Sequence, residues 1–195
     1  MLHIWRPAPT DPASAVAFII GAVLFFALIL FARVRAGRSQ GGDARSYGSW
    51  VGAFIQGAAI ALAGGPVIVR PGMADPARTI AVALLMTASV GLFAWSVRTM
   101  GRNWAIVART RADHGLVTTG PFAFVRNPIY VAMAFFMLGF TVATGHEPAL
   151  ILAAPVFVIG TLIRTMQEER LLRAHFGAAY EDYAARVKRF VPGVF

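Results

Sequence analysis

The chain has 195 residues, of which 57% are hydrophobic and only 14% are charged, and it contains no cysteine. This length is typical of one domain, so we treat 1–195 as a single unit. Without cysteine, both a disulfide framework and a thiolate metal site are excluded, and we predict no metal site. The mean hydropathy of +0.64 indicates a membrane protein, and the net charge of +9 is then better explained by membrane topology than by nucleic-acid binding.

Five apolar stretches follow one another along the chain. Each is long enough, or nearly so, to cross a bilayer, which takes about 20 helical residues. Glycine and proline at Gly64-Gly65-Pro66 predict a break at the end of the second stretch, and Pro155 predicts a bend in the fifth, which is short. The sequence therefore predicts an all-α polytopic integral membrane protein with five transmembrane helices. The stretches are 13–32, 46–69, 79–97, 128–145 and the residues between Glu147 and Arg164.

Basic residues are distributed unevenly around these stretches. Such a bias marks the cytoplasmic side of a membrane protein, so we expect the amino terminus outside and the carboxyl terminus in the cytoplasm. Only Arg6, Arg70 and Arg78 fall on the outer side. The cytoplasmic side has the other 15 basic residues, namely Arg33, Arg35, Arg38, Arg45, Arg98, Arg102, Arg109, Arg111, Arg126, Arg164, Arg170, Arg173, Arg186, Lys188 and Arg189.

The carboxyl-terminal tail has a helical apolar pattern. Its aromatic and aliphatic residues recur at spacings of four, three, four and three, which place them on one helix face. We therefore predict an amphipathic cytoplasmic helix that lies on the membrane surface or covers a site beside it, and that ends at Pro192. The residues on this face are Phe176, Tyr180, Tyr183, Val187 and Phe190.

A polar passage at 109–132 lies between the third and fourth apolar stretches. Proline is well tolerated at the first position of a helix, so a helix can begin at Pro128, and proline disfavours helical conformation at the residue before it. Asn127 is therefore a candidate N-cap, and Arg126 is expected at the mouth of the fourth helix. His114 on its own is typical of a loop histidine, and Tyr130 on its own is typical of an interfacial aromatic residue.

Charged residues mark the end of the fifth stretch. Arg164 and Glu168 are four residues apart, which puts them on the same helix face. One interpretation is an interfacial salt bridge with an arginine that reaches toward water. The other is functional: Glu168 faces a cationic ligand and Arg164 an anionic one, as ionisable groups at membrane depth often do.

Taken together, these motifs resemble the isoprenylcysteine carboxyl methyltransferase family, which belongs to a wider group with phospholipid methyltransferases. The resemblance covers roughly residues 95–195, and the first half of the chain matches only as membrane helices. The matching motifs are His114-Gly-Leu-Val, Gly120-Pro121-Phe122, Arg126-Asn127-Pro128-Ile-Tyr130, Arg164-x-x-x-Glu168-Glu169 and the Tyr180/Tyr183 tail that ends near Pro192.

The resemblance implies a methyltransferase that uses S-adenosylmethionine. It implies a cofactor-binding catalytic half in 98–195, which follows the three predicted transmembrane helices in 1–97. The family binds this cofactor without a Rossmann domain, and consistent with that the sequence has no dinucleotide-type glycine motif. Arg164 and Glu168 would be catalytic, with Glu168 contacting the cofactor and Arg164 contacting a carboxylate of the acceptor. The cofactor site would also include His114, Gly115, Leu116, Val117, Phe122, Asn127, Pro128, Ile129 and Tyr130.

The chain departs from the family pattern at Asn127, where histidine is usual, at Phe122, where tyrosine is common, and at Ala132, where glycine is usual. Asparagine still donates and accepts hydrogen bonds but cannot carry charge. A carboxylate or thiolate acceptor needs no base, whereas an amine or alcohol does. Glu168, Glu169 and His114 are the candidate bases.

The expected acceptor is a lipophilic small molecule that enters from the bilayer, such as a prenylcysteine-like carboxylate. Alternatives are a phospholipid amine and a small thiol. Two further classes remain open at this point. Sterol reductases have a similar carboxyl-terminal membrane architecture but use NADPH, and a non-catalytic sensor could keep the same site.

Overall fold

The structure, a computed structural model, describes residues 8–36, 47–65, 71–101 and 115–194. Every regular element within these ranges is helical. The expected break in the second apolar stretch is confirmed, because α2 ends at Gly64. His114, one of the predicted site residues, lies outside the described residues. The elements are α1 (Pro12–Ala36), α2 (Tyr47–Gly64), α3 (Pro76–Met100), η3 (Gly120–Ala123), α4 (Pro128–Thr144), η4 (Glu147–Ala149), α5 (Leu150–Phe176) and α6 (Ala178–Arg186).

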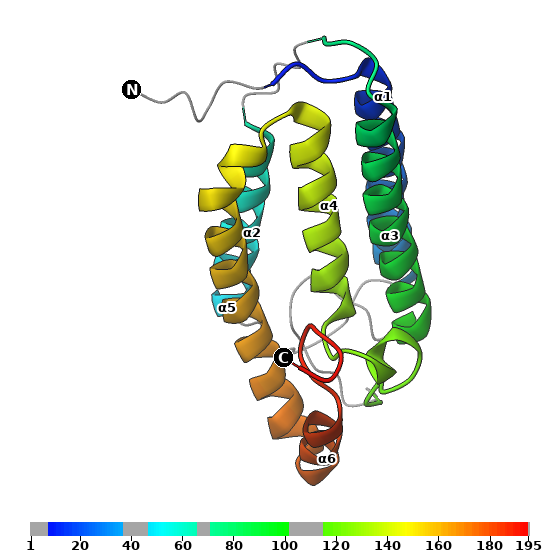
Figure 1. Cartoon of the computed structure of the whole chain (residues 1–195). Coiled ribbons are helices and arrows are strands. Elements are labelled where there is room, and N and C mark those ends of the chain that lie inside the picture. The colour runs from blue at the N-terminus through cyan, green and yellow to red at the C-terminus, as the bar shows by residue number, and fades with distance from the viewer. Residues whose placement is uncertain (1–7, 37–46, 66–70, 102–114, 195) are drawn as a thin grey trace.

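Helix α4 is the centre of the bundle. It lies between a pair formed by α1 and α3 and a second pair formed by α2 and α5, and the long helices alternate in direction (Figure 1). The carboxyl ends of α1, α3 and α5 therefore meet the amino end of α4 at one end of the bundle, which also has η3 and α6. This arrangement brings the polar passage before α4 close to the charged end of α5.

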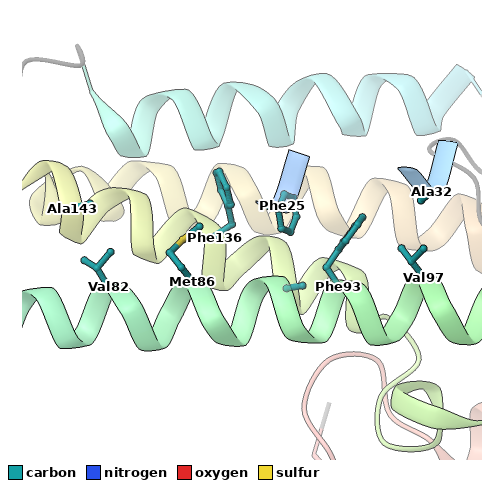
Figure 2. Packing of buried hydrophobic residues seen from close by; sticks show 9 residues of the cluster. Phe25, Ala32, Val82, Met86, Phe93, Val97, Phe136 and Ala143 are labelled. Carbon is teal, nitrogen blue, oxygen red and sulfur yellow. The ribbon is translucent and has the colours of Figure 1, made fainter. Parts of the chain in front are cut away.

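Large apolar side chains fill the space between α1, α3 and α4 (Figure 2). Phe25 of α1 has its ring centroid 4.7 Å from that of Phe93 in α3 and 5.0 Å from that of Phe136 in α4. Met86 packs beside them, and Phe18 stacks on Phe140 at 4.8 Å. Aromatic pairs in these geometries stabilise a core beyond the area they bury. This cluster fixes α4 against the α1–α3 pair.

Small residues bring α2 and α5 into close contact. A Cβ atom on Gly160 would lie 2.9 Å from both the backbone oxygen of Gly52 and the backbone nitrogen of Gln56, so the two helices meet backbone to backbone there. Such contacts replace the hydrophobic effect as the source of helix association in a membrane. Beside this contact, Met137 of α4 and Phe157 of α5 belong to a second apolar cluster that joins α2, α4 and α5.

Polar contacts fix the end of the bundle opposite α6. The Asp11 carboxylate accepts hydrogen bonds from the Ala13 N–H at 2.9 Å and the Thr79 hydroxyl at 2.8 Å, and the bond from Ala13 is the main cause of its lowered pKa. Arg78 donates to Glu147 at 2.6 Å. These bonds join the starts of α1 and α3 to η4, which leads into α5, so helix positions are set at both ends.

The outward surface of the bundle is apolar. Large side chains along α1 such as Ile19, Val23 and Phe26 are more than half exposed, which is expected when lipid rather than water surrounds the protein. Three helices are long and apolar enough to cross a membrane: α1, α3 and the helix that runs through η4 and α5. Helices α2 and α4 are shorter apolar helices. The chain is therefore a helical membrane protein.

Helix α5 continues beyond the fifth apolar stretch to Phe176, through a run of residues that favour helix. One predicted boundary was wrong. The predicted tail helix is interrupted: Gly177, with φ +52, separates α5 from α6, and α6 ends at Arg186. Val187 is extended, and the backbone of Lys188 forms a bridge with Val125. Pairing with another segment thus replaces helix in the last part of the predicted pattern.

The contact between α2 and α5 gives a stability prediction. Replacing Gly160 by alanine places a methyl group against the backbone of α2, and overpacking of this kind typically costs about 1–3 kcal/mol. We expect a lower unfolding temperature for Gly160→Ala in detergent. Gly57→Ala is the matched control, because a Cβ at Gly57 meets nothing within 4 Å. An equal unfolding temperature for the two variants would contradict the close approach.

Candidate functional site

The segment before α4 is fixed by backbone pairing with the carboxyl-terminal tail. Val125 forms a parallel bridge with Lys188, and the Arg126 and Asn127 N–H groups donate to the carbonyls of Lys188 and Arg189 at 2.8 and 3.1 Å. Helix α4 then begins at Pro128, as predicted. These bonds set the direction in which the first turn of α4 presents its side chains.

Asn127 occupies the predicted N-cap position, but its side chain does not cap the helix. Its Nδ2 instead donates to the Arg189 carbonyl at 3.3 Å, while its own carbonyl accepts from the Tyr130 N–H at 3.1 Å. The amide is used to hold the tail because Arg189 passes directly beside it. A neutral asparagine can make this bond without adding a further charge beside the arginines of the site.

The central polar cluster joins α4 to α5. The Tyr130 hydroxyl donates to Glu168 Oε1 at 2.5 Å, and Arg164 Nη2 lies 4.0 Å from the same oxygen. The Arg164 guanidinium also lies over the Tyr130 ring, 5.1 Å from its centroid. The predicted pairing of Arg164 with Glu168 on one helix face is confirmed. Glu168 remains about a quarter exposed, at 27% of its side chain, so a ligand can still reach it.

Helix α2 extends this cluster. Gln56 Oε1 accepts a hydrogen bond from Arg164 Nη1 at 3.0 Å, and Gln56 Nε2 donates to the Thr161 hydroxyl at 2.7 Å. Gln56 is completely buried. Neither Gln56 nor Thr161 was predicted from the sequence. A signal was present, because Gln56 is the single amide side chain in the mostly apolar α2, and polar residues inside membrane segments often mark a site.

The neighbouring carboxylate, Glu169, has a different environment. Its side chain is 2% exposed and is held by three arginines. Arg189 binds both of its oxygens, at 2.9 and 2.8 Å, while Arg126 and Arg173 each lie at 3.3 Å. A carboxylate compensated in this way is poorly suited to accept a proton, so Glu169 is an anchor in the structure rather than a base. It connects α5, the segment before α4 and the tail.

Tyrosines of α6 complete this end of the molecule. The Tyr183 hydroxyl donates to the Phe122 carbonyl at 2.7 Å, which ties α6 to η3. Burial raises the pKa of Tyr183, and burial together with the charge of Glu169 raises the pKa of Tyr180 to about 12. Both hydroxyls therefore stay protonated at neutral pH. The hydrogen bonding that Arg189 donates to the Glu169 carboxylate is the main cause of the raised pKa of Arg189.

The predicted cofactor residues fall into several environments. Tyr130 joins Glu168 directly, whereas Phe122, Asn127 and Pro128 are buried in and around the segment that the tail holds. Ile129 packs against the α1–α3–α4 apolar cluster instead. The remaining predicted residues in the described chain precede η3, where Gly115 is exposed and Leu116 and Val117 are half-buried. Their part in binding a cofactor stays a prediction.

The fold and this cluster define a class: a helical membrane protein with a buried polar site between the amino end of α4 and the charged end of α5. The sequence profile of the phospholipid methyltransferase family matches residues 77–179, which include both elements. The chain belongs to this family. The resemblance to membrane methyltransferases that the sequence motifs indicated is thereby confirmed.

Three curated relatives match part of the chain. The nickel-cobalt-cadmium resistance protein NccN of Alcaligenes xylosoxydans is 32% identical over 58% of this chain and 52% of its own length. The cobalt-zinc-cadmium resistance protein CzcN of Cupriavidus metallidurans is 33% identical over 56% of this chain and 50% of its own length. The protein-S-isoprenylcysteine O-methyltransferase of Schizosaccharomyces pombe is 32% identical over 45% of this chain and 37% of its own length. The chain thus spans about half or less of the relatives it matches.

Two of these names refer to metals. In the described part of the chain, no group of three or more histidine, aspartate or glutamate side chains is placed to hold a metal ion. The charged groups described at the site are paired carboxylates and arginines.

The environment of Glu169 gives a second stability prediction. In Glu169→Gln the carboxylate is lost while three guanidinium groups remain, and breaking a buried ion pair on one side typically costs about 3–5 kcal/mol. We expect earlier proteolysis of the tail after Val187 and a lower unfolding temperature. Glu181→Gln is the control, because Glu181 is exposed and pairs only with Arg173 among the described residues. Such surface pairs contribute about 0–1 kcal/mol, so equal effects in both variants would rule out the anchor role.

Proposed function

We propose that the protein is an S-adenosylmethionine-dependent methyltransferase that methylates a lipophilic acceptor taken from the bilayer. The observation that carries the proposal is the group formed by Tyr130, Glu168 and Arg164 at the junction of α4 and α5. It places one carboxylate and one guanidinium side by side at the end of an apolar bundle. Such a pair suits a reaction between a cationic donor and an anionic acceptor. Membership of the methyltransferase family supports the same reaction class.

The described residues fit the proposed cofactor. Glu168 and the ring of Tyr130 offer a carboxylate and an aromatic face, and both attract a cation such as a sulfonium. Arg126 offers the complementary charge: its Nε and Nη1 are buried and have no hydrogen-bond partner among the described residues, and a carboxylate would satisfy them. When bound, S-adenosylmethionine supplies an activated methyl group, so the protein mainly has to orient the partners and exclude water.

The chain's own residues then have separate roles. Glu168 stabilises positive charge at the donor, and the Tyr130 hydroxyl holds that carboxylate in one orientation. Arg164 is 8% exposed and lies over Tyr130, so it is placed to bind a carboxylate or phosphate of the acceptor through its planar fork. An acceptor that is already anionic would need no base from the protein to receive the methyl group that S-adenosylmethionine would supply. We propose a lipid carboxylate, such as a prenylcysteine, as the acceptor type.

The test uses purified protein, tritiated S-adenosylmethionine and a lipid extract, and measures both labelled lipid and S-adenosylhomocysteine. We expect turnover in the wild type. In Glu168→Gln, loss of a charge-assisted contact should weaken cofactor affinity about ten- to a hundredfold, as measured by calorimetry. Unchanged cofactor affinity in a folded variant would show that Glu168 only forms a salt bridge with Arg164.

Binding of NADPH instead of S-adenosylmethionine would favour a reductase, and cofactor binding without turnover would favour a sensor.

The proposed topology has five spans, with α6 and the site on the cytoplasmic side. Supporting this, Arg33, Arg35 and Arg98 end helices at the same end of the bundle as α6 (Figure 1). A reporter that is active only in the cytoplasm should be active when fused after Phe195, because most of the described basic residues lie at the end of the bundle that contains α6, and such an excess marks the cytoplasmic side. The same reporter inserted at 70–78 should be inactive. The reverse pattern would contradict cytoplasmic access to the site.

A further inference from the structure

Gln56 is the contact through which the amino-terminal half of the chain reaches the proposed site. Its side chain is fully buried and bonds two residues of α5, Arg164 and Thr161. The close approach of α2 and α5 at Gly52 and Gly160 makes these bonds possible, because neither glycine has a side chain to hold the helices apart. The amide therefore lies on a rigid contact rather than on a loop.

The two bonds determine the orientation of the guanidinium. Gln56 Oε1 accepts from Nη1 of Arg164 at 3.0 Å, while Nη2 faces Glu168 at 4.0 Å and the guanidinium lies over the Tyr130 ring. On the other side, the amide Nε2 is held by the Thr161 hydroxyl at 2.7 Å. Because both ends of the amide are engaged, Gln56 has one orientation, and it holds one edge of the planar Arg164 fork.

The neutrality of this amide also matters. In the described chain, Glu168 is the carboxylate that pairs with Arg164, at 4.0 Å, and Glu168 also accepts from Tyr130. A glutamate at position 56 would form a second, fully buried ion pair with Arg164 and would compete with any anionic ligand. A glutamine satisfies a guanidinium N–H without adding a negative charge beside it.

We propose that Gln56 is a positioning residue that sets specificity, by holding Arg164 in the orientation in which it meets the anionic group of the acceptor, without placing a second carboxylate beside it. This inference rests on the proposed function and extends the site to α2. The geometry distinguishes it from simple burial of a polar group. A purely structural glutamine would affect stability alone, whereas a positioning one affects recognition of the acceptor's charge.

Two substitutions separate these roles. Gln56→Met keeps the length and apolar packing of the side chain but loses both hydrogen bonds. Gln56→Glu keeps an acceptor for Arg164 and adds a competing negative charge. Thr141→Val is the matched control, because Thr141 is also fully buried, but the one hydrogen bond described for its hydroxyl stays within α4, to the Met137 carbonyl at 2.9 Å.

The probe is N-acetyl-S-farnesylcysteine, a lipophilic carboxylate, compared with its uncharged carboxamide. Equilibrium dialysis gives the affinity for each probe, steady-state kinetics give KM and kcat for the carboxylate, and calorimetry gives cofactor affinity. In Gln56→Met we expect KM to rise about tenfold or more, since a bond to a charged group is lost, with cofactor affinity and kcat changed less than about twofold. In Gln56→Glu we expect the preference for the carboxylate over the carboxamide to fall by about tenfold or more.

The outcomes are distinct. Wild-type affinities that do not favour the carboxylate, or a preference that is unchanged in Gln56→Glu, would overturn the role of Gln56. The same conclusion follows if Gln56→Met behaves like Thr141→Val in all of these measurements. Should the wild type bind the carboxylate but transfer no methyl group, the proposed function fails, and the dialysis comparison still decides the inference. If Gln56→Met does not fold, the Gln56→Glu comparison decides it.

Discussion

Burial of the Glu169 carboxylate is the constraint on which the site depends. An ionised carboxylate inside an apolar bundle is very costly unless it is compensated, and here Arg126, Arg173 and Arg189 surround it. These arginines come from the segment before α4, from α5 and from the tail. The requirement to neutralise one charge thus brings three separate parts of the chain together, and the first turn of α4 is fixed against α5 as a result.

Adjacent glutamates on α5 show how helix geometry divides two tasks. Successive residues point about 100° apart around a helix, so Glu168 faces Tyr130 and Arg164 while Glu169 faces the arginines of the anchor. Glu168 stays partly exposed and Glu169 does not. The anchor holds the surrounding segments in place, and Glu168 is thereby kept beside Tyr130 with a face open to a ligand.

Local patterns in the sequence predicted the local features. The start of α4 followed from Pro128, and the pairing of Arg164 with Glu168 followed from their spacing of four. The features that sequence reasoning missed depend on contacts distant in the chain. Gln56 and Arg164 are 108 residues apart, and no periodicity links them. The tail pattern predicted one long helix, but backbone pairing of Lys188 with Val125 outweighed it. Cofactor binding by Leu116 and Val117 remains a prediction.

The position of the Glu169 arginines along the chain has a consequence for biogenesis. Proteins are synthesised from the amino terminus, and early segments begin to fold first. Because α2 precedes α5 in the chain, Gln56 is synthesised before its partner Arg164. Arg189 comes later than both, and with it the cation that binds both oxygens of Glu169. A chain truncated before Arg189 would therefore contain all the long helices but would lack the arginine that binds both oxygens of the Glu169 carboxylate.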